Sequence, residues 1–431
     1  MAKPLKAQWQ LNNRLLPLLT GMLLVIEIVS PYRGWLVLLI GLGGAWLISA
    51  LWARSLSRSL EVYREMRFGW AQVGDQLVER FTLSNRSNFP ALWLELVDHS
   101  TLPNYHVSRG IGIGADSFIR WHLEATCSRR GLFYLGPLEI RSGDPFGLYT
   151  ITLEYPATMP LLVLPPIVPL PQIEVAPGGR AGDGRPRRSS FDRTISAASV
   201  REYAPGDSRR WIHWKTTARR EDLFVRLFDG TPSGDWWILL DVNQAVQTGI
   251  GENSTEELGI ILAASLADRG WRAKRAVGLL ANGEELLWLP PRAGAGQRWE
   301  LLRSLALLSP GQSDLAALLY RVKPALRQHT SIIIITPAVA GDWIAELLPL
   351  QHRGVIPTVL LLDPSSFGGT GSTAGAAQQL TQVGVAHYTI TSELLATPEA
   401  RPGQGQEWQV LGTGKAVPRH QTSDTAWKVL S

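Results

Sequence analysis

An uninterrupted apolar stretch, GWLVLLIGLGGAWLISALWA, runs from Gly34 to Ala53 and decides the first part of the fold. It carries no charge and is long enough to cover a bilayer hydrocarbon core, which takes about 20 residues of helix. A second apolar segment, LLPLLTGMLLVIEIV, runs from Leu15 to Val29. Because lipid offers no partners to free backbone groups, the two segments predict a hairpin of transmembrane helices, at about residues 14–31 and 34–53.

Basic residues flank these segments unequally. They stand before the first segment and after the second, at Lys3, Lys6, Arg14, Arg54, Arg58, Arg64 and Arg67, whereas the connection contains only Arg33. The positive-inside rule therefore predicts a two-pass protein of the inner membrane whose soluble domains are cytoplasmic. Glu27 lies near the connection, where it can reach the headgroups. The alternative, a cleaved signal peptide, fits less well because a second apolar segment follows at once.

Composition limits what the rest of the chain can be. The chain has 431 residues, of which 45% are hydrophobic and 18% charged, so it can bury the cores of two or three domains and is not intrinsically disordered. Cys127 is the only cysteine, which excludes a disulfide framework and a CxxC zinc site. The net charge of +5 is small and spread out, so no nucleic-acid partner is expected.

Residues 59–170 alternate short apolar runs with turn residues, which predicts an antiparallel β-sandwich-like domain. Three histidines in this part, His99, His106 and His122, have no spacing that places them on one metal. Residues 171–199 are rich in Gly, Arg, Ser and Pro and predict a linker. This linker is either a solvated tether or a basic arm that lies on anionic lipid.

Residues 231–395 alternate buried strands with amphipathic helices, which predicts an α/β domain with a mostly parallel sheet. The first long helix should begin at a cap, Asn253 or Ser254, and stop at Gly270. The stretch SSFGGTGSTAGAA after Asp363 indicates a flexible loop. A tail, 396–431, contains two candidate edge strands. The whole chain is thus predicted to be an α+β multidomain protein.

A ligand site in such a sheet lies past the carboxyl ends of its strands. The predicted ends are Asp241, Ala281, Thr336 and Asp363.

The segment VREYAPGDSRRWIHWKTTARREDLFVRLFD, within residues 200–230, combines many charged and aromatic side chains. Pro205, Gly206 and Asp207 predict a tight turn. On a strand, Ile212 and Trp214 would share one face and His213 would lie on the other.

This segment closely resembles the signature of the bacterial domain-of-unknown-function 58 family. The matching residues are Arg201, Glu202, Tyr203, Gly206, Asp207, Arg210, Ile212, Trp214, Ala218 and Arg219, and His213 lies among them. The stretch RRGLFYLGPLEIRSGDPFGL, residues 129–148, and the two-helix amino terminus are also similar to the family. The resemblance implies a carboxy-terminal domain like that of von Willebrand factor A and a neighbouring MoxR-type AAA+ ATPase as partner.

A von Willebrand A domain with an ion site would carry Asp-x-Ser-x-Ser after its first strand, because a hard cation needs oxygen ligands. Here Asp241 is present and Asn243 offers one amide oxygen, but Ala245 offers none and the later strand ends in Thr336 rather than Asp. The sequence therefore predicts a degenerate site with two weak metal candidates, Asp241 and Asn243, and no cofactor.

Two hypotheses for function remain. The first is a non-catalytic adaptor, anchored in the lipid bilayer, whose signature either fixes the fold through ion pairs or docks a partner, since Arg and Trp are favoured at interface hot spots. The second is a metal-dependent hydrolase-like enzyme that uses Asp207, His213 and Asp241 as acid, base and ligand. No nucleophile elbow or cofactor fingerprint accompanies these three residues.

Overall fold

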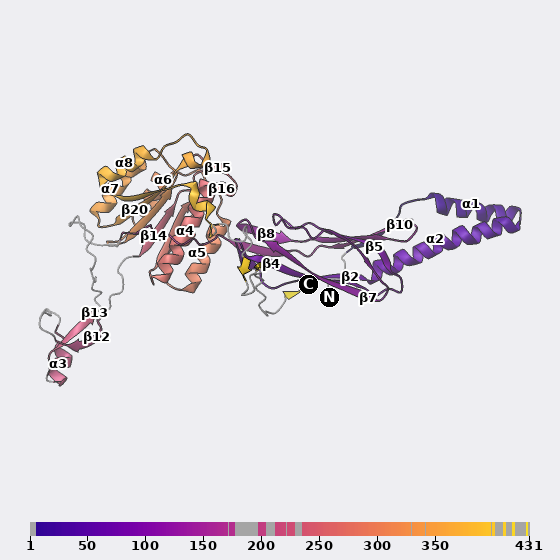
Figure 1. The fold of residues 1–431 in the computed structure, drawn as a ribbon, viewed down its shortest axis with the longest axis horizontal. Helices are drawn as coiled ribbons and strands as arrows, with labels where there is room; N and C mark the ends of the chain where they lie inside the picture. Colours follow the sequence, from indigo (N-terminus) through magenta and orange to yellow (C-terminus); the bar gives the residue numbers. More distant parts are fainter. Residues whose placement is uncertain are drawn as a thin grey trace. The chain divides into compact units, whose positions relative to one another are not determined.

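The structure, a computed structural model, describes a defined part of the chain (Figure 1). The described residues are 6–170, 172–176, 197–203, 212–220, 222–228, 235–328, 330–340, 342–397, 399–400, 408–410, 416–418 and 428–429. They divide into two compact units, Met1–Leu164 with Arg401–Ser431, here the β unit, and Pro165–Ala400, here the α/β unit. The predicted linker falls mostly outside the described residues.

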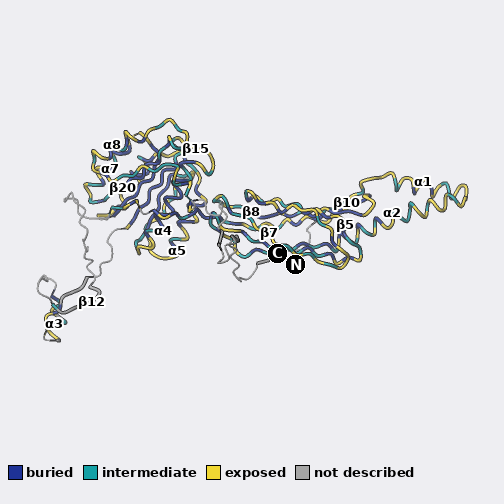
Figure 2. Tube along the Cα trace, in the orientation of Figure 1, coloured by how far each residue is buried: buried dark blue, intermediate teal, exposed yellow. Residues whose placement is uncertain are grey.

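Two apolar helices, α1 (Leu15–Val29) and α2 (Arg33–Ser59), belong to the β unit. By length and composition α2 is able to cross a membrane, whereas α1 is shorter. The helices approach closely at Gly43, where an added Cβ would lie 3.3 Å from the Cγ2 of Thr20. The last turns of α2 enter the β core, where Ala53 and Leu56 are fully buried. The helix therefore continues beyond residue 53, because its apolar side chains pass from an exposed environment into a protein core (Figure 2).

The predicted antiparallel β-sheets of the first unit are confirmed, except that β3 pairs with β11 in parallel. A five-stranded sheet has the order β1-β10-β9-β5-β6, a four-stranded sheet the order β24-β2-β4-β7, and a three-stranded sheet the order β3-β11-β8. The strands are β1 (Lys6–Leu11), β2 (Leu60–Met66), β3 (Trp70–Gln72), β4 (Gln76–Asn85), β5 (Ala91–Asp98), β6 (Arg109–Ile113), β7 (Ser117–Thr126), β8 (Gly131–Leu135), β9 (Leu138–Gly143), β10 (Tyr149–Tyr155), β11 (Met159–Leu164) and β24 (Lys428–Val429).

The core of the β unit comes from period-two alternation. Along β4, buried side chains such as Phe81 and Leu83 alternate with half-buried ones. Strand β1 was not predicted, because its polar residues resemble a flank of the first helix; it pairs with β10, with Leu11 opposite Tyr149.

The α/β unit contains a six-stranded mixed sheet of order β18-β17-β14-β19-β20-β21, in which only β18 is antiparallel to its neighbour. The strands are β14 (Trp236–Leu240), β17 (Val277–Asn282), β18 (Leu286–Arg292), β19 (Ser331–Thr336), β20 (Ile356–Leu362) and β21 (Ala386–Ile390). The helices are α4 (Thr255–Arg272), α5 (Ala295–Leu307), α6 (Leu315–Val322), α7 (Leu347–His352) and α8 (Ala374–Val383). Continuous burial of β14, β17 and β19 explains their unbroken apolar sequence.

Two predictions about this unit were wrong in detail. Ser254 caps α4 by accepting from the amide of Glu257, but the helix passes through Gly270 to Arg272. A Cβ at Gly270 would lie 2.8 Å from the ring of Trp236, so this glycine permits close helix–sheet packing and does not end the helix. The stretch after Asp363 is not one loop, since it forms a 3-10 helix, Pro364–Phe367, and the start of α8.

A smaller element in this unit carries the signature. Strands β12 (Ala197–Glu202) and β13 (Phe224–Phe228) form an antiparallel pair, and helix α3 (Trp214–Arg220) lies between them in sequence. Further two- and three-residue strands are β15 (Gly249–Ile250), β16 (Asn253–Ser254), β22 (Trp408–Val410) and β23 (Ala416–Pro418).

Candidate functional site

The carboxyl edge of the mixed sheet brings together three polar side chains. Asp241 follows β14, and Asn282 and Thr336 are the last residues of β17 and β19. All three are buried, with exposed fractions of 2%, 1% and 0%. The neighbouring parallel strands β14, β17 and β19 end at the same edge, so the three residues meet although they are far apart in sequence.

The Asp241 carboxylate accepts three hydrogen bonds from donors of the protein. Its Oδ1 accepts from the Nδ2 of Asn282 at 2.9 Å and from the amide of Asn243 at 3.1 Å. Its Oδ2 accepts from the Oγ1 of Thr336 at 2.7 Å. Burial raises the pKa of Asp241, and the nearby charge of Asp314 raises it further. The three hydrogen bonds lower this pKa in part.

The loop after β14 is held in the same network. The Oδ1 of Asn282 accepts from the amide of Val242 at 2.7 Å, and the Nε2 of Gln247 donates to the carbonyl of Asp241 at 2.9 Å. The hydroxyl of Thr255 donates to the Oε1 of Gln247 at 2.7 Å. The edge is thus a rigid hydrogen-bonded cap whose polar groups face one another.

This arrangement leaves the two metal candidates occupied by the protein. Besides the three bonds of Asp241, the Oδ1 of Asn243 accepts from the amide of Ala245 at 3.1 Å within its own loop. Within the described ranges, no group of three or more His, Cys, Asp or Glu side chains could hold a metal ion. Asn282 was not among the predicted site residues, and its only local signal is that it is the polar last residue of an otherwise apolar strand.

The fourth predicted strand end, Asp363, behaves differently. Its Oδ1 accepts from the amide of Ser365 at 3.2 Å and its Oδ2 from the hydroxyl of the same residue at 2.7 Å. Asp363 therefore caps the short 3-10 helix after β20.

The signature residues that the structure describes surround α3. Ile212 is buried, and Trp214 is the first residue of α3 with 66% of its surface exposed. Trp214 therefore does not share a strand face with Ile212, because the chain turns into a helix between them. Ala218 and Arg219 lie on α3 and are exposed.

His213 is a helix cap in this element. Its Nδ1 accepts from the amide of Thr216 at 3.3 Å and lies 2.7 Å from the hydroxyl of the same residue. The ring of His213 therefore holds the first turn of α3 in place.

The remaining signature residues are only partly described. Arg201 and Glu202 lie in β12, opposite Val225 and Phe224. The amide of Tyr203 donates to the carbonyl of Leu223 at 2.7 Å. Gly206, Asp207 and Arg210 lie outside the described residues, so the predicted grouping of Asp207 with His213 and Asp241 stays a prediction.

A second buried polar cluster lies in the β unit and was not predicted. Arg64 is 3% exposed and donates to both carboxylate oxygens of Glu79, at 3.0 and 2.9 Å, and to Asp98 at 3.2 Å. The hydroxyl of Tyr105 also bonds Glu79. Arg64 is therefore not a flanking surface charge, as the positive-inside count assumed, but the centre of an ion cluster.

Burial raises the pKa of Glu79; Arg64 lowers it in part, and Asp98 raises it further.

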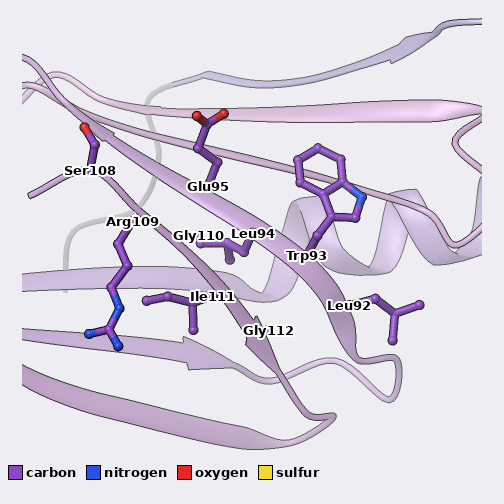
Figure 3. A pocket seen from close by; sticks show the side chains of 9 residues that line it. All are labelled: Leu92, Trp93, Leu94, Glu95, Ser108, Arg109, Gly110, Ile111 and Gly112. Atoms are coloured by element: carbon purple, nitrogen blue, oxygen red, sulfur yellow. The ribbon is translucent and has the colours of Figure 1, made fainter.

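A shallow groove of about 570 Å³ runs along β5 and β6 (Figure 3). Leu92 and Trp93 line one end of it, and Ser108 and Arg109 line the other. No catalytic side-chain pair faces it among the residues shown.

Two uncharacterized bacterial proteins are similar to this chain. It is similar to the uncharacterized protein YeaD of Bacillus subtilis, with 25% identity over 309 residues that cover 69% of this chain and 74% of the relative. It is also similar to the uncharacterized protein Rv1480 of Mycobacterium tuberculosis, with 24% identity over 38% of this chain and 54% of that one. The chain thus spans about half the length of that relative.

Similarity to solved structures is weak. A proximal thread matrix protein from the mussel byssus matches with 13% identity and a TM-score of 0.29, over 38% of this chain and 46% of that one. A likeness of this size supports no conclusion about fold or function.

The family described as "Protein of unknown function DUF58" matches residues 199–367. This range contains most of the described signature. It also contains four parallel strands of the mixed sheet, β14, β17, β19 and β20. The predicted resemblance to this family is therefore confirmed over residues 199–367.

Proposed function

We propose that this protein is an adaptor of the inner membrane, held by α1 and α2, with its soluble units in the cytoplasm. The observation that carries the proposal is the exposed apolar surface of α2, where 69% of Val37 and 66% of Ile40 are uncovered. An apolar surface of this kind costs free energy in water, about 25 cal/mol per Å², and is stabilised when lipid covers it.

The adaptor role rests on the signature element. Trp214 exposes 66% of its surface, and Arg219 on the same helix, α3, is also exposed. Exposed Trp and Arg side chains are the types that carry binding energy at protein interfaces. We propose that α3 docks a protein partner and that the partner is a MoxR-type AAA+ ATPase in envelope-related assembly, as the family resemblance implies.

The α/β unit also fits the proposed adaptor role. We regard it as a von Willebrand A-like domain in which the hydrogen bonds of Asp241 replace an ion. A carboxylate that accepts from Asn282 and Thr336 stabilises the loop between β14 and α4 without a metal. Such a domain can present a surface to a partner without catalysing a reaction.

Membrane anchoring is tested by flotation of the full chain with native-composition vesicles. The double variant Val37→Arg with Ile40→Arg should leave the lipid fraction, since each charge at a helix centre costs about 2.5–3.5 kcal/mol. Tyr320→Arg, at a residue of α6 with 72% exposure, is the matched control and should float as the unchanged chain does. A chain that stays in the soluble fraction without any substitution contradicts the proposal.

Orientation and partner need separate measurements. A reporter fused after Ser431 should be active only in the cytoplasm. Cross-linking in native membranes followed by mass spectrometry should recover an AAA+ ATPase with the unchanged chain and with Tyr320→Ala, and lose it with Trp214→Ala. Equal recovery with Trp214→Ala, while folding is intact by circular dichroism, would exclude α3 as the docking element.

A further inference from the structure

One end of the β unit lies beside α2. The Nε1 of Trp46 donates to the hydroxyl of Tyr149 at 2.8 Å, and the Nε1 of Trp52 donates to the carbonyl of Pro90 at 3.0 Å. The residue that leads into α1 is tied to the same end, since the amide of Asn12 donates to the carbonyl of Leu148 at 2.8 Å. The turns at residues 86–90 and 144–148 are therefore fixed at the level of these helical turns (Figure 1).

The turns of α2 at that level have an exposed apolar side. Leu47, Ile48 and Leu51 are 60%, 49% and 51% exposed, on the same turns that carry Trp46 and Trp52. The next charged residue along α2 is Arg54, which is exposed. If lipid covers the apolar side of α2, the hydrocarbon boundary therefore lies between Leu51 and Arg54, with the arginine at the headgroups.

The length of α1 leads to the same boundary. The helix has 15 residues, or about 22 Å at about 1.5 Å per residue, whereas the hydrocarbon core is about 30 Å thick. The uncharged run of α2 from Gly34 to Ala53 does match that thickness. A part of the protein other than α1 must therefore fill the outermost layer of the bilayer's hydrocarbon core beside α2. The end of the β unit is hydrogen-bonded to α2 at this level.

Several exposed side chains at this end of the β unit are apolar, which suits the outermost layer of the hydrocarbon core. Leu92, Trp93 and Phe146 are 58%, 44% and 60% exposed, and we name these three residues the membrane-side face. The groove in Figure 3 has the same polarity, since its end at Leu92 and Trp93 is apolar and its other end carries Ser108 and Arg109. Arg120, exposed and stacked 4.9 Å from the ring of Phe118, adds a cation suited to anionic headgroups.

We propose that the membrane-side face inserts into the inner leaflet of a phospholipid bilayer, so that the β unit is docked on the membrane and not only tethered to it. This inference rests on the proposed membrane anchoring and goes beyond it, because it assigns lipid contact to residues of the β-sheet turns. Aromatic side chains favour the boundary between headgroups and acyl chains, which is where the argument from α2 places them.

The test uses one fluorescent label at a time on the full chain in vesicles. The chain has 17 tryptophans, so intrinsic fluorescence does not report a single site. Its only cysteine, Cys127, is fully buried and its pKa is raised to about 12 by burial, so the native thiol should not take up a maleimide. Phe146→Cys and Leu92→Cys place an environment-sensitive label on the face, and Leu132→Cys, at a 43% exposed residue of β8, places it elsewhere in the β unit.

The label at 146 or 92 should show a blue-shifted emission that doxyl-labelled phospholipid quenches, and the label at 132 should show neither. Equal emission of all three labels in vesicles that carry the floated protein would overturn the inference and leave the anchoring intact. A blue shift without doxyl quenching would mean that protein covers the face, which also overturns it. Failure of the unlabelled chain to float would refute the anchoring itself.

Discussion

Glu79 of the β unit and Asp241 of the α/β unit are both buried carboxylates, but they are stabilised in different ways. Glu79 is fully buried and receives two hydrogen bonds from the guanidinium of Arg64. Asp241 is 2% exposed and accepts from an amide side chain, a hydroxyl and a backbone N–H, all of them neutral. The first site depends on charge balance and the second on the geometry of neutral donors.

The comparison teaches that burial dominates both sites. Desolvation raises the pKa of each carboxyl, and neither the guanidinium nor the neutral donors cancel that rise. In the Arg64 cluster, one cation faces two carboxylates, Glu79 and Asp98, so full ionisation leaves an excess negative charge. In the Asp241 network, Oδ1 accepts two hydrogen bonds and Oδ2 accepts one, all from neutral donors.

The largest effect is expected from removing the buried cation. Arg64→Met should destabilise the β unit by about 3–5 kcal/mol, because Glu79 and Asp98 then lose their partner inside the core. Hydrogen exchange of the β4 amides measures this loss. Arg80→Met on β4 is the control, since Arg80 pairs with Glu65 at 3.6 Å with 34% of its side chain exposed and should contribute about 0–1 kcal/mol. Similar losses for both variants would contradict the cluster's role.

Removing the neutral-donor site should cost less. Asp241→Ala leaves the buried donors of Asn282 and Thr336 unpaired, which we expect to destabilise the α/β unit by about 1–3 kcal/mol. Hydrogen exchange of β14 reports the change. Asp363→Ala, at the partly exposed cap after β20, should have a smaller effect on β14. If added magnesium stabilises the unchanged chain and Asp363→Ala but not Asp241→Ala, Asp241 binds the ion and is not held by protein donors alone.

The pH dependence should differ in sign between a buried and a surface carboxyl. The folded pKa of Glu79 is raised above the ordinary value of 4.5, so its stabilising contribution is complete below that value and is lost as the pH rises through the folded pKa. The folded pKa of Glu139 is lowered, mainly by its hydrogen bond with Arg141, so its contribution is present above the ordinary value and is lost as the pH falls through the folded pKa.

Urea unfolding between about pH 2 and pH 8 compares these two carboxyls. Glu79→Gln should reduce the loss of stability at rising pH, and Glu139→Gln should reduce the loss at falling pH. A Glu79→Gln chain with an unchanged pH profile would show that Glu79 does not titrate in this range.

The smallest effect is expected at a buried carboxylate, Asp268, that pairs with an exposed arginine. Asp268 is bonded by Arg272 at 2.6 Å and by Arg298 at 3.0 Å, and the side chain of Arg272 is 71% exposed. Arg272→Ala should therefore change the stability of the α/β unit by only about 0.3–0.5 kcal/mol, as for other exposed i,i+4 pairs. A loss comparable to that of Arg64→Met would mean that exposure does not separate these pairs.

The sequence by itself determined the features that arise from short-range patterns. The run from Gly34 to Ala53 specifies an apolar helix, the alternation in β4 specifies a strand with one buried face, and SIIIIT specifies a central parallel strand. The signature around Trp214 identified the family, since a motif is a local property of the chain. Ser254 as the cap of α4 belongs to the same class.

Only the tertiary structure decided the long-range contacts. Arg64 looked like a flanking charge, and burial against Glu79 and Asp98 made it the centre of a cluster. Gly270 looked like a helix stop, but the ring of Trp236 requires a glycine inside the helix. Asn282 reaches Asp241 only because parallel strands end at one edge. In each case the deciding partner is distant along the chain, and a local pattern carries no information about which distant residue folding brings into contact.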